Sequence, residues 1–254
     1  MTVRPKKWLG QHFLVDENLL GVIGRLAELA ENDVVLEVGP GLGVLTRYLA
    51  ERVDLVHAVE LDRSLEPQLA LGERVRVTFG DALVLDLGAL DPPPNKLVSN
   101  LPYAIATPLV AESLERLPSV ELWCVMVQRE VAERFFAAPR NKAYGAVSVL
   151  LQLGADRIGF HPVSRTVFRP RPNVDSALVA FRRLPLPADF AWVRRVVEAA
   201  FAHRRKTLSN SIALSGLASR GRVDEALDAI GSAPMTRAEA LTPADFVALA
   251  EALR

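Results

Sequence analysis

Four consecutive residues, Asn100-Leu101-Pro102-Tyr103, have the chemistry to hold a planar ring that bears an exocyclic amino group. The amide oxygen of Asn100 can accept a hydrogen bond from such an amino group. Pro102 has a fixed φ and favours an extended conformation for Leu101, so the Leu101 carbonyl points in a set direction. The ring of Tyr103 offers a flat face for stacking on a base. The same quartet also fits an ordinary strand-to-helix turn, because Asn and Pro favour turns.

The elements around this quartet would bring it to the ligand-binding edge of a sheet. The apolar run Leu97-Val98 precedes it and a helix over about 105–116 follows. In open α/β sheets, ligands bind outside the carboxyl ends of the strands. Alternating patterns predict strands at about 34–38, 55–59, 75–79, 96–99, 120–127, 155–161 and 175–181, and helices at about 16–30, 44–51 and 128–138. Residues 145–154 favour a helix, with a strand as the alternative. We therefore predict a doubly wound α/β domain.

A glycine-rich turn follows the first predicted strand. Gly39-Pro40-Gly41-Leu42-Gly43 comes directly after residues 34–38, which is typical of the start of a nucleotide-binding βαβ unit. Glu60 ends the next strand, where an acid suits the two hydroxyls of a ribose. Asp81 ends the third strand and could accept from an adenine amino group, although a helix cap or a turn explains it equally well. These residues indicate an adenosine-containing cofactor and leave NAD, FAD and S-adenosylmethionine open.

Charge is distributed unevenly along the 254 residues, although 30 Lys and Arg balance 30 Asp and Glu. Residues 31–130 hold eight Lys and Arg against 16 Asp and Glu, whereas residues 165–206 hold ten against three. We expect a polyanion to meet the second stretch and the basic residues near the N-terminus. A solvated surface without a ligand is the alternative.

The single cysteine, Cys124, excludes an intrachain disulfide and a cysteine-based zinc cluster. Neither a signal peptide nor an apolar run of membrane-spanning length is apparent. We expect a soluble, cytoplasmic monomer with no metal and no membrane partner.

A proline-rich segment, Leu184-Pro185-Leu186-Pro187, marks a predicted domain boundary. Beyond it the pattern is helical, at about 190–203, 206–216, 222–230 and 243–252. The predicted organisation is an arm over residues 1–15, a Rossmann-like domain over 16–185 and a small all-helical domain over 186–254.

Taken together and in order, these motifs make the sequence resemble the small-subunit ribosomal RNA adenine dimethyltransferases, over nearly the whole chain. The matching stretches are Gly10 to Leu14, Glu37 to Gly43, Glu60-Leu61-Asp62, Gly80-Asp81-Ala82, Asn100 to Tyr103, Phe168 to Pro172 with Val174 to Ala177, and Arg204 to Leu208. The resemblance implies an S-adenosylmethionine-dependent methyltransferase fold. It also implies dimethylation of the exocyclic N6 of two adjacent adenosines, in the hairpin loop near the 3′ end of 16S rRNA.

The resemblance also implies roles for individual residues. Asn100, Leu101, Tyr103 and Phe168 would hold the target base, with the two aromatic rings on its opposite faces. Contacts to S-adenosylmethionine would come from His12, Leu14, Gly39, Glu60, Asp81 and Asn100. Many relatives have Asn where this chain has His12, so the resemblance leaves open whether the His12 side chain or its backbone matters. The arm would fold over the cofactor.

Phosphates of the RNA would meet the basic residues Arg194, Arg195, Arg204, Arg205 and Lys206, which fall at helical spacings in the predicted helical domain. For the last three, a cluster that caps the end of a helix is the alternative. Three other functions remain open: methylation of large-subunit rRNA, as in the related macrolide-resistance enzymes, RNA binding without catalysis, and a Rossmann dehydrogenase.

Overall fold

The computed structural model describes residues 11–254, which fall into two compact units. The first unit holds the described residues up to Ala132 together with Arg157–Arg183, and the second holds Glu133–Asp156 and Leu184–Arg254. The sequence assigns residues 133–156 to the Rossmann-like domain, whereas in the structure they group with the second unit. Their helix, α5 (Ala146–Gly154), is almost entirely apolar, and it packs against helices of the second unit, α6 and α9.

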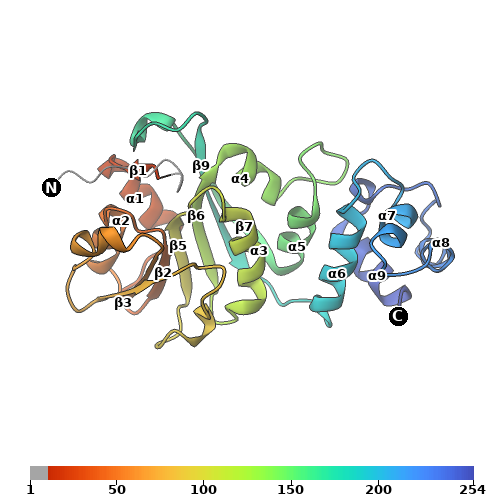
Figure 1. Cartoon of the computed structure of the whole chain (residues 1–254), viewed down its shortest axis with the longest axis horizontal. Helices are drawn as coiled ribbons and strands as arrows, with labels where there is room; N and C mark the ends of the chain where they lie inside the picture. The colour runs from red at the N-terminus through yellow and green to blue at the C-terminus, as the bar shows by residue number, and fades with distance from the viewer. Residues whose placement is uncertain (1–10) are drawn as a thin grey trace. The chain divides into compact units, whose positions relative to one another are not determined.

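The first unit is built on a seven-stranded sheet with the strand order β4-β3-β2-β5-β6-β9-β7 (Figure 1). The strands are β2 (Val34–Val38), β3 (Leu55–Glu60), β4 (Val75–Phe79), β5 (Lys96–Asn100), β6 (Leu122–Gln128), β7 (Ala155–Val163) and β9 (Ser176–Arg183). From β4 to β6 all neighbours are parallel, and β6 and β9 are antiparallel. The predicted doubly wound α/β fold is confirmed.

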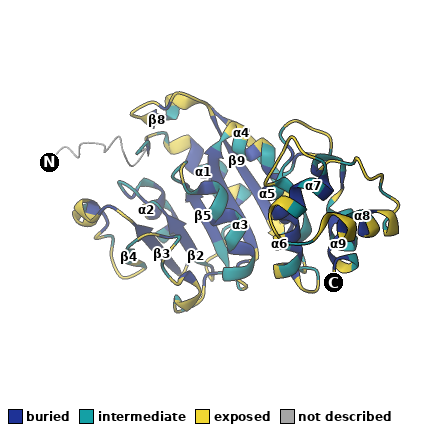
Figure 2. Cartoon of the chain, turned by 45° about the vertical axis from the view of Figure 1, so that its right-hand side comes forward, coloured by how far each residue is buried: buried dark blue, intermediate teal, exposed yellow. Residues whose placement is uncertain are grey.

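Two helices connect parallel strands: α2 (Val44–Ala50) joins β2 to β3, and α3 (Ala106–Arg116) joins β5 to β6. α1 (Glu17–Leu26) precedes β2 and α4 (Arg129–Phe135) follows β6, and short 3₁₀ turns lie at Arg63–Gln68, Leu87–Ala89 and Arg165–Val167. The side chain of Asp16 accepts from the Asn18 N–H and so starts α1. This helix ends at Leu26 and not near residue 30, because Glu28 adopts a positive φ of 48°. The inner strands of the sheet, from β3 to β9, are mostly buried, whereas β4 and β7 at its two edges are partly exposed (Figure 2).

Strand order creates a crevice between β2 and β5. The chain steps outward from β2 through β3 to β4, and then returns to the other side of β2 as β5, with Val35 opposite Lys96. Loops that leave β2 and β5 at their carboxyl ends therefore run in opposite directions and leave room between them. The glycine turn and the Asn100 quartet follow these two strands.

A second, two-stranded sheet joins distant parts of the first unit. β1 (Phe13–Leu14) pairs antiparallel with β8 (Phe168–Arg169), with Leu14 opposite Phe168. The Val15 N–H extends the pairing by donating to the Val167 carbonyl at 2.9 Å. Residues 11–15 are thereby held against the segment that follows β7.

The second unit contains α5, α6 (Phe190–Phe201), α7 (Leu208–Leu214), α8 (Arg220–Ala229), a 3₁₀ turn (Ala238–Ala240) and α9 (Pro243–Ala252). Its core includes the fully buried rings of Tyr144 and Phe246, with Phe201 packed between them. Thr242 caps α9 by accepting from the Asp245 N–H. Among residues 11–254, no helix has the length and apolarity to span a bilayer.

Candidate active site

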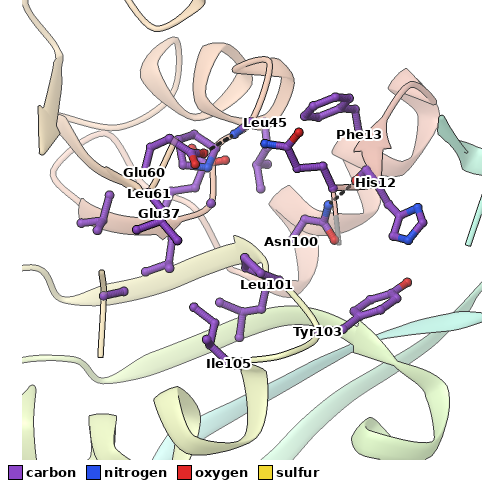
Figure 3. A pocket seen from close by; sticks show the side chains of 18 of the residues that line it. His12, Phe13, Glu37, Leu45, Glu60, Leu61, Asn100, Leu101, Tyr103 and Ile105 are labelled. Atoms are coloured by element: carbon purple, nitrogen blue, oxygen red, sulfur yellow. Dashed lines mark hydrogen bonds between the residues drawn. The ribbon is translucent and has the colours of Figure 1, made fainter. Parts of the chain in front are cut away.

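A cavity of about 210 Å³ lies at the carboxyl ends of the parallel strands of the first unit (Figure 3). Its walls are the loops that follow β2, β3, β4 and β5, and residues 11–14 close one side. Of the residues predicted to act on cofactor or base, all except Phe168 line it: His12, Leu14, Gly39, Glu60, Asp81, Asn100, Leu101 and Tyr103. The fold therefore gathers side chains that lie up to 91 positions apart, from His12 to Tyr103.

The glycine turn and the Asn100 quartet touch each other across the crevice. Gly39 has φ +76°, and a Cβ at this position would lie 2.9 Å from Cγ of Pro102. A Cβ at Gly41, where φ is +58°, would lie 2.9 Å from the ring of Phe13. Any other residue would be strained here and would push the neighbouring segment away. These glycines bring three walls of the cavity into contact.

Glu60 is held by the backbone on both sides of its carboxylate. Oε1 accepts from the Asp62 N–H at 2.8 Å, and Oε2 accepts from the Gly41 N–H at 3.1 Å. Each carboxylate oxygen has a second acceptor site. The side chain is therefore fixed before any ligand binds, and it can still accept from the two hydroxyls of a ribose.

Glu37 is a second buried acid in the cavity wall, and no functional role is predicted for it from the sequence. Its Oε2 has no hydrogen-bond partner among the described residues. Burial raises the pKa of Glu37 to about 8; a polar contact with Thr46 lowers that pKa, and the charge of Glu60 adds to the rise. An acid in the otherwise apolar strand Val34–Val38 was the signal that could have identified it.

Hydrogen bonds tie the Asn100 quartet to two neighbouring segments. The Asn100 Nδ2 donates to the His12 carbonyl at 3.4 Å, which leaves Oδ1 as the atom able to accept from a ligand (Figure 3). The Leu101 N–H donates to the Met126 carbonyl at 3.1 Å and ties this loop to β6. Two oxygen acceptors, the Asn100 amide and the Leu101 carbonyl, thus belong to one braced segment.

Tyr103 is half-buried, and its hydroxyl forms a hydrogen bond with Ser176 Oγ at 2.7 Å. Burial raises its pKa, the bond to Ser176 lowers it, and the nearby Asp175 raises it. The ring is therefore a neutral phenol at physiological pH, held at its tip. Its centroid lies 5.8 Å from that of His12, at an interplanar angle of 33°.

Residues 11–14 are hydrogen-bonded to two of the cavity loops and to Pro170. Gln11 donates to Asp62 at 3.1 Å, and the imidazole Nδ1 of His12 lies 2.7 Å from the Pro170 carbonyl, to which it donates. The side chain of His12 is thus engaged with Pro170, while its backbone carbonyl receives Asn100. Residues 1–10 of the predicted arm lie outside the described residues.

Phe168, which the sequence predicts to cover one face of the base, does not line the cavity. Its ring is 2% exposed and packs in the hydrophobic core together with Leu14, its partner across the two-stranded sheet. Full burial of a Phe side chain is worth roughly 1.5–3 kcal/mol. The β1–β8 pairing therefore turns this ring into the core and away from the cavity wall.

Asp81 is exposed at the cavity edge, and its Oδ1 accepts from the Leu83 N–H at 2.9 Å. The turn interpretation is therefore correct for this residue. Its second carboxylate oxygen is still available, so a cofactor contact is compatible with the turn.

The predicted RNA-binding residues lie in the second unit and have different surroundings. Arg204 donates to the carbonyls of Lys142 and of Tyr144, the latter at 3.2 Å. Arg205 and Lys206 are exposed, in the segment between α6 and α7. Arg194 and Arg195 lie on α6, where the guanidinium of Arg195 is 5.3 Å from the centre of the Trp192 ring.

Comparisons with known proteins agree with this arrangement. A sequence model of the family "Ribosomal RNA adenine dimethylase" matches residues 3–254. The chain is 52% identical over 253 residues to "Ribosomal RNA small subunit methyltransferase A" of Rubrobacter xylanophilus, covering 98% of this chain and 95% of that one. It is 45% identical to the protein of the same name from Thermobifida fusca, covering 98% and 90%.

Two solved structures share the fold. A dimethyladenosine transferase from Plasmodium falciparum superposes with a TM-score of 0.76 at 22% identity, covering 94% of this chain and 96% of that one. The 23S rRNA methyltransferase ErmE superposes with a TM-score of 0.65 at 30% identity, covering 95% and 99%.

Proposed function

Since the chain belongs to the ribosomal RNA adenine dimethylase family, we propose that it transfers methyl groups from S-adenosylmethionine to N6 of two adjacent adenosines. The proposed target is the hairpin loop near the 3′ end of 16S rRNA, within the small ribosomal subunit. One observation carries the proposal: the glycine turn and the Asn100 quartet share a single cavity with two buried acids. A cofactor pocket and an amino-group clamp therefore adjoin.

The cavity residues fit S-adenosylmethionine, which supplies an electrophilic methyl group on a sulfonium sulfur. Glu60 would accept from the ribose hydroxyls, and Asp81 from the adenine amino group. Glu37 supports the fit, because its unpartnered oxygen is buried and an ammonium group beside it would favour its ionised form. The Cβ-free backbone at Gly39 would let the ligand approach the turn.

The clamp would act on the amino group of the target adenine. The lone pair of this nitrogen is delocalised into the ring, which makes it a poor nucleophile. Asn100 Oδ1 and the Leu101 carbonyl would hold its two hydrogens and favour a more tetrahedral nitrogen. Positive charge develops there during transfer, so fixed acceptor dipoles stabilise the transition state more than the ground state. The methylated nitrogen is strongly acidic, so its proton can leave to water without a side-chain base.

Tyr103 would provide the stacking surface for the base, which has to leave its own stack to enter the cavity. Because its hydroxyl is tied to Ser176, the ring loses little freedom on binding. His12, whose ring lies beside that of Tyr103, extends this aromatic surface. With Phe168 buried, these two rings are the ones we expect the base to meet.

RNA phosphates would contact the second unit at Arg205 and Lys206, which are exposed. Arg204 would contribute indirectly, by holding the backbone at residues 142–144. The named relatives favour the small subunit over the large one as the substrate. The two small-subunit methyltransferases are 52% and 45% identical to this chain, against 30% for ErmE.

The test is incubation of the protein with S-adenosylmethionine labelled in its methyl group and with separated small and large subunits that lack the modification. We expect label only in small-subunit RNA, and mass analysis of its 3′ hairpin should give two dimethyladenosines. Label in large-subunit RNA alone would overturn the substrate assignment. The absence of label in both subunits, with RNA binding intact, would favour a non-catalytic RNA-binding protein.

A further inference from the structure

The turn that carries Asp81 is held by a side chain from another element. Arg116, in the last turn of α3, donates from Nη1 to the Leu83 carbonyl at 3.1 Å and from Nη2 to the Leu85 carbonyl at 2.5 Å. Glu112, one helical turn earlier, accepts from the same Nη1 at 3.0 Å. Two carbonyls and one carboxylate therefore fix the plane of this guanidinium.

Residues 81–85 form one hydrogen-bonded unit. The bonds that Arg116 makes to Leu83 and Leu85 therefore also fix the position of Asp81 at the other end of the unit. The Asp81 carbonyl accepts from the N–H groups of Val84 and Leu85, and Asp81 Oδ1 accepts from the Leu83 N–H. The side chain of Leu85 also lies over Gly80, where a Cβ would come within 2.9 Å of it. Asp81 itself is exposed, so no surrounding core orients it.

We propose that Arg116 is a positioning residue for recognition of the adenine end of the cofactor, acting through the 81–85 turn on the Asp81 carboxylate. This inference rests on the proposed function, in which Asp81 accepts from the adenine amino group. Arg116 does not line the cavity, and with Glu112 it has the i, i+4 spacing of an ordinary surface ion pair. Its bonds to the two carbonyls are what distinguish it from such a pair.

The test compares binding of S-adenosylhomocysteine with that of S-inosylhomocysteine, in which a carbonyl oxygen replaces the adenine amino group. The full-length protein should prefer the adenosyl compound. Arg116→Met keeps much of the side chain's bulk and removes its donors, so we expect the ratio of the two affinities to fall roughly five- to tenfold. The ammonium group of Arg116→Lys can reach one carbonyl only. The affinity ratio of this variant should therefore lie between those of the unsubstituted protein and Arg116→Met.

Arg183 supplies a matched control at the same end of α3. It donates to the carbonyls of Leu114, Leu117 and Val120, and none of these residues belongs to the 81–85 turn. Arg183→Met should lower the melting temperature and leave the affinity ratio unchanged.

The outcomes separate this inference from the proposed function. If Arg116→Met loses affinity for both compounds by the same factor, so that the affinity ratio is unchanged, the positioning role is overturned. If that variant does not fold, the affinity ratio of Arg116→Lys decides by the same criterion. If the unsubstituted protein binds S-adenosylhomocysteine but does not discriminate against the inosyl compound, the role of Asp81 fails. If it binds neither compound, the cofactor assignment itself is wrong.

Discussion

Three side chains of the cavity in the first unit, Glu60, Asn100 and Tyr103, are hydrogen-bonded to other groups of the protein, whereas the basic residues Arg205 and Lys206 of the second unit are exposed. Glu60 accepts from two backbone N–H groups, Asn100 donates to His12, and Tyr103 is bonded to Ser176. Fixed dipoles favour catalysis, because they need no reorganisation when charge develops. Exposed cations suit a polyanion, because they attract phosphates over a distance and release counterions.

This contrast predicts that substitutions in the cavity wall change the chemical step, while substitutions at the exposed cations change RNA affinity and its dependence on salt. Glu37 is the exception in the cavity wall, since one of its oxygens has no protein partner among residues 11–254. Substitutions at Asn100, at Glu37 and in the basic residues Arg204 to Lys206 examine the contrast.

Asn100→Ala should have the largest effect. It removes one of the two proposed acceptors, and loss of one such group costs about 10²–10³ in kcat. Affinity for the RNA should stay within about tenfold, or roughly 1.4 kcal/mol, because the phosphate contacts are elsewhere. Single-turnover methylation and a binding titration on the same variant measure both. Asn18→Ala, an exposed Asn in the first turn of α1, is the control. Full activity of the Asn100 variant would refute the clamp.

Glu37→Gln should change how stability depends on pH. The pKa of this carboxyl rises from 4.5 to about 8 in the folded protein, so between these values the folded state keeps a proton that the unfolded chain releases. The free energy of unfolding contributed by Glu37 therefore falls as pH rises through this window, by on the order of 5 kcal/mol in total.

The Gln side chain does not titrate. The free energy of unfolding of the variant minus that of the unsubstituted protein should therefore increase between pH 5 and pH 9. Urea unfolding of both proteins at the two pH values, without cofactor, measures the difference. If the stability of the two proteins changes with pH by the same amount, Glu37 is ionised in the folded protein and has a partner.

Arg205→Ala and Lys206→Ala should have the smallest effects. Each is expected to weaken RNA binding a few-fold and to reduce the slope of log affinity against log salt by about one, with kcat at saturating RNA unchanged. Arg204→Ala should also lower the melting temperature, because the carbonyls of Lys142 and Tyr144 lose their donor. Arg222→Ala, an exposed Arg on α8, is the control. An unaltered salt slope in both single variants would remove these residues from the RNA interface.

Much of the first unit could be predicted from the sequence, because its signals are local. Apolar runs bounded by glycines and acids gave the strands, and the carboxyl-end rule then placed Glu60, Asp81 and Asn100 around one cavity. The helix over 145–154 was identified, but its membership of the second unit was not, since it depends on packing against α6 and α9.

What the sequence could not supply were contacts between distant segments. Nothing local to Phe168 indicates that Leu14 lies opposite it and draws its ring into the core. Glu37 was visible as an acid among apolar residues, yet its missing partner depends on the whole wall of the cavity. From the sequence, Arg116 can be recognised only as one partner of a surface ion pair. Its contact with the 81–85 turn depends on the fold.

The pairing of β1 with β8 has a consequence for synthesis of the chain. Phe13 and Leu14 are synthesised roughly 155 residues before Arg169 and Phe168, with which they pair. In a nascent chain, β1 therefore has no strand to pair with until β8 has left the ribosome. Only then can residues 11–14 close their side of the pocket, so a truncated product that ends before β8 has the glycine turn and the quartet but no finished binding site.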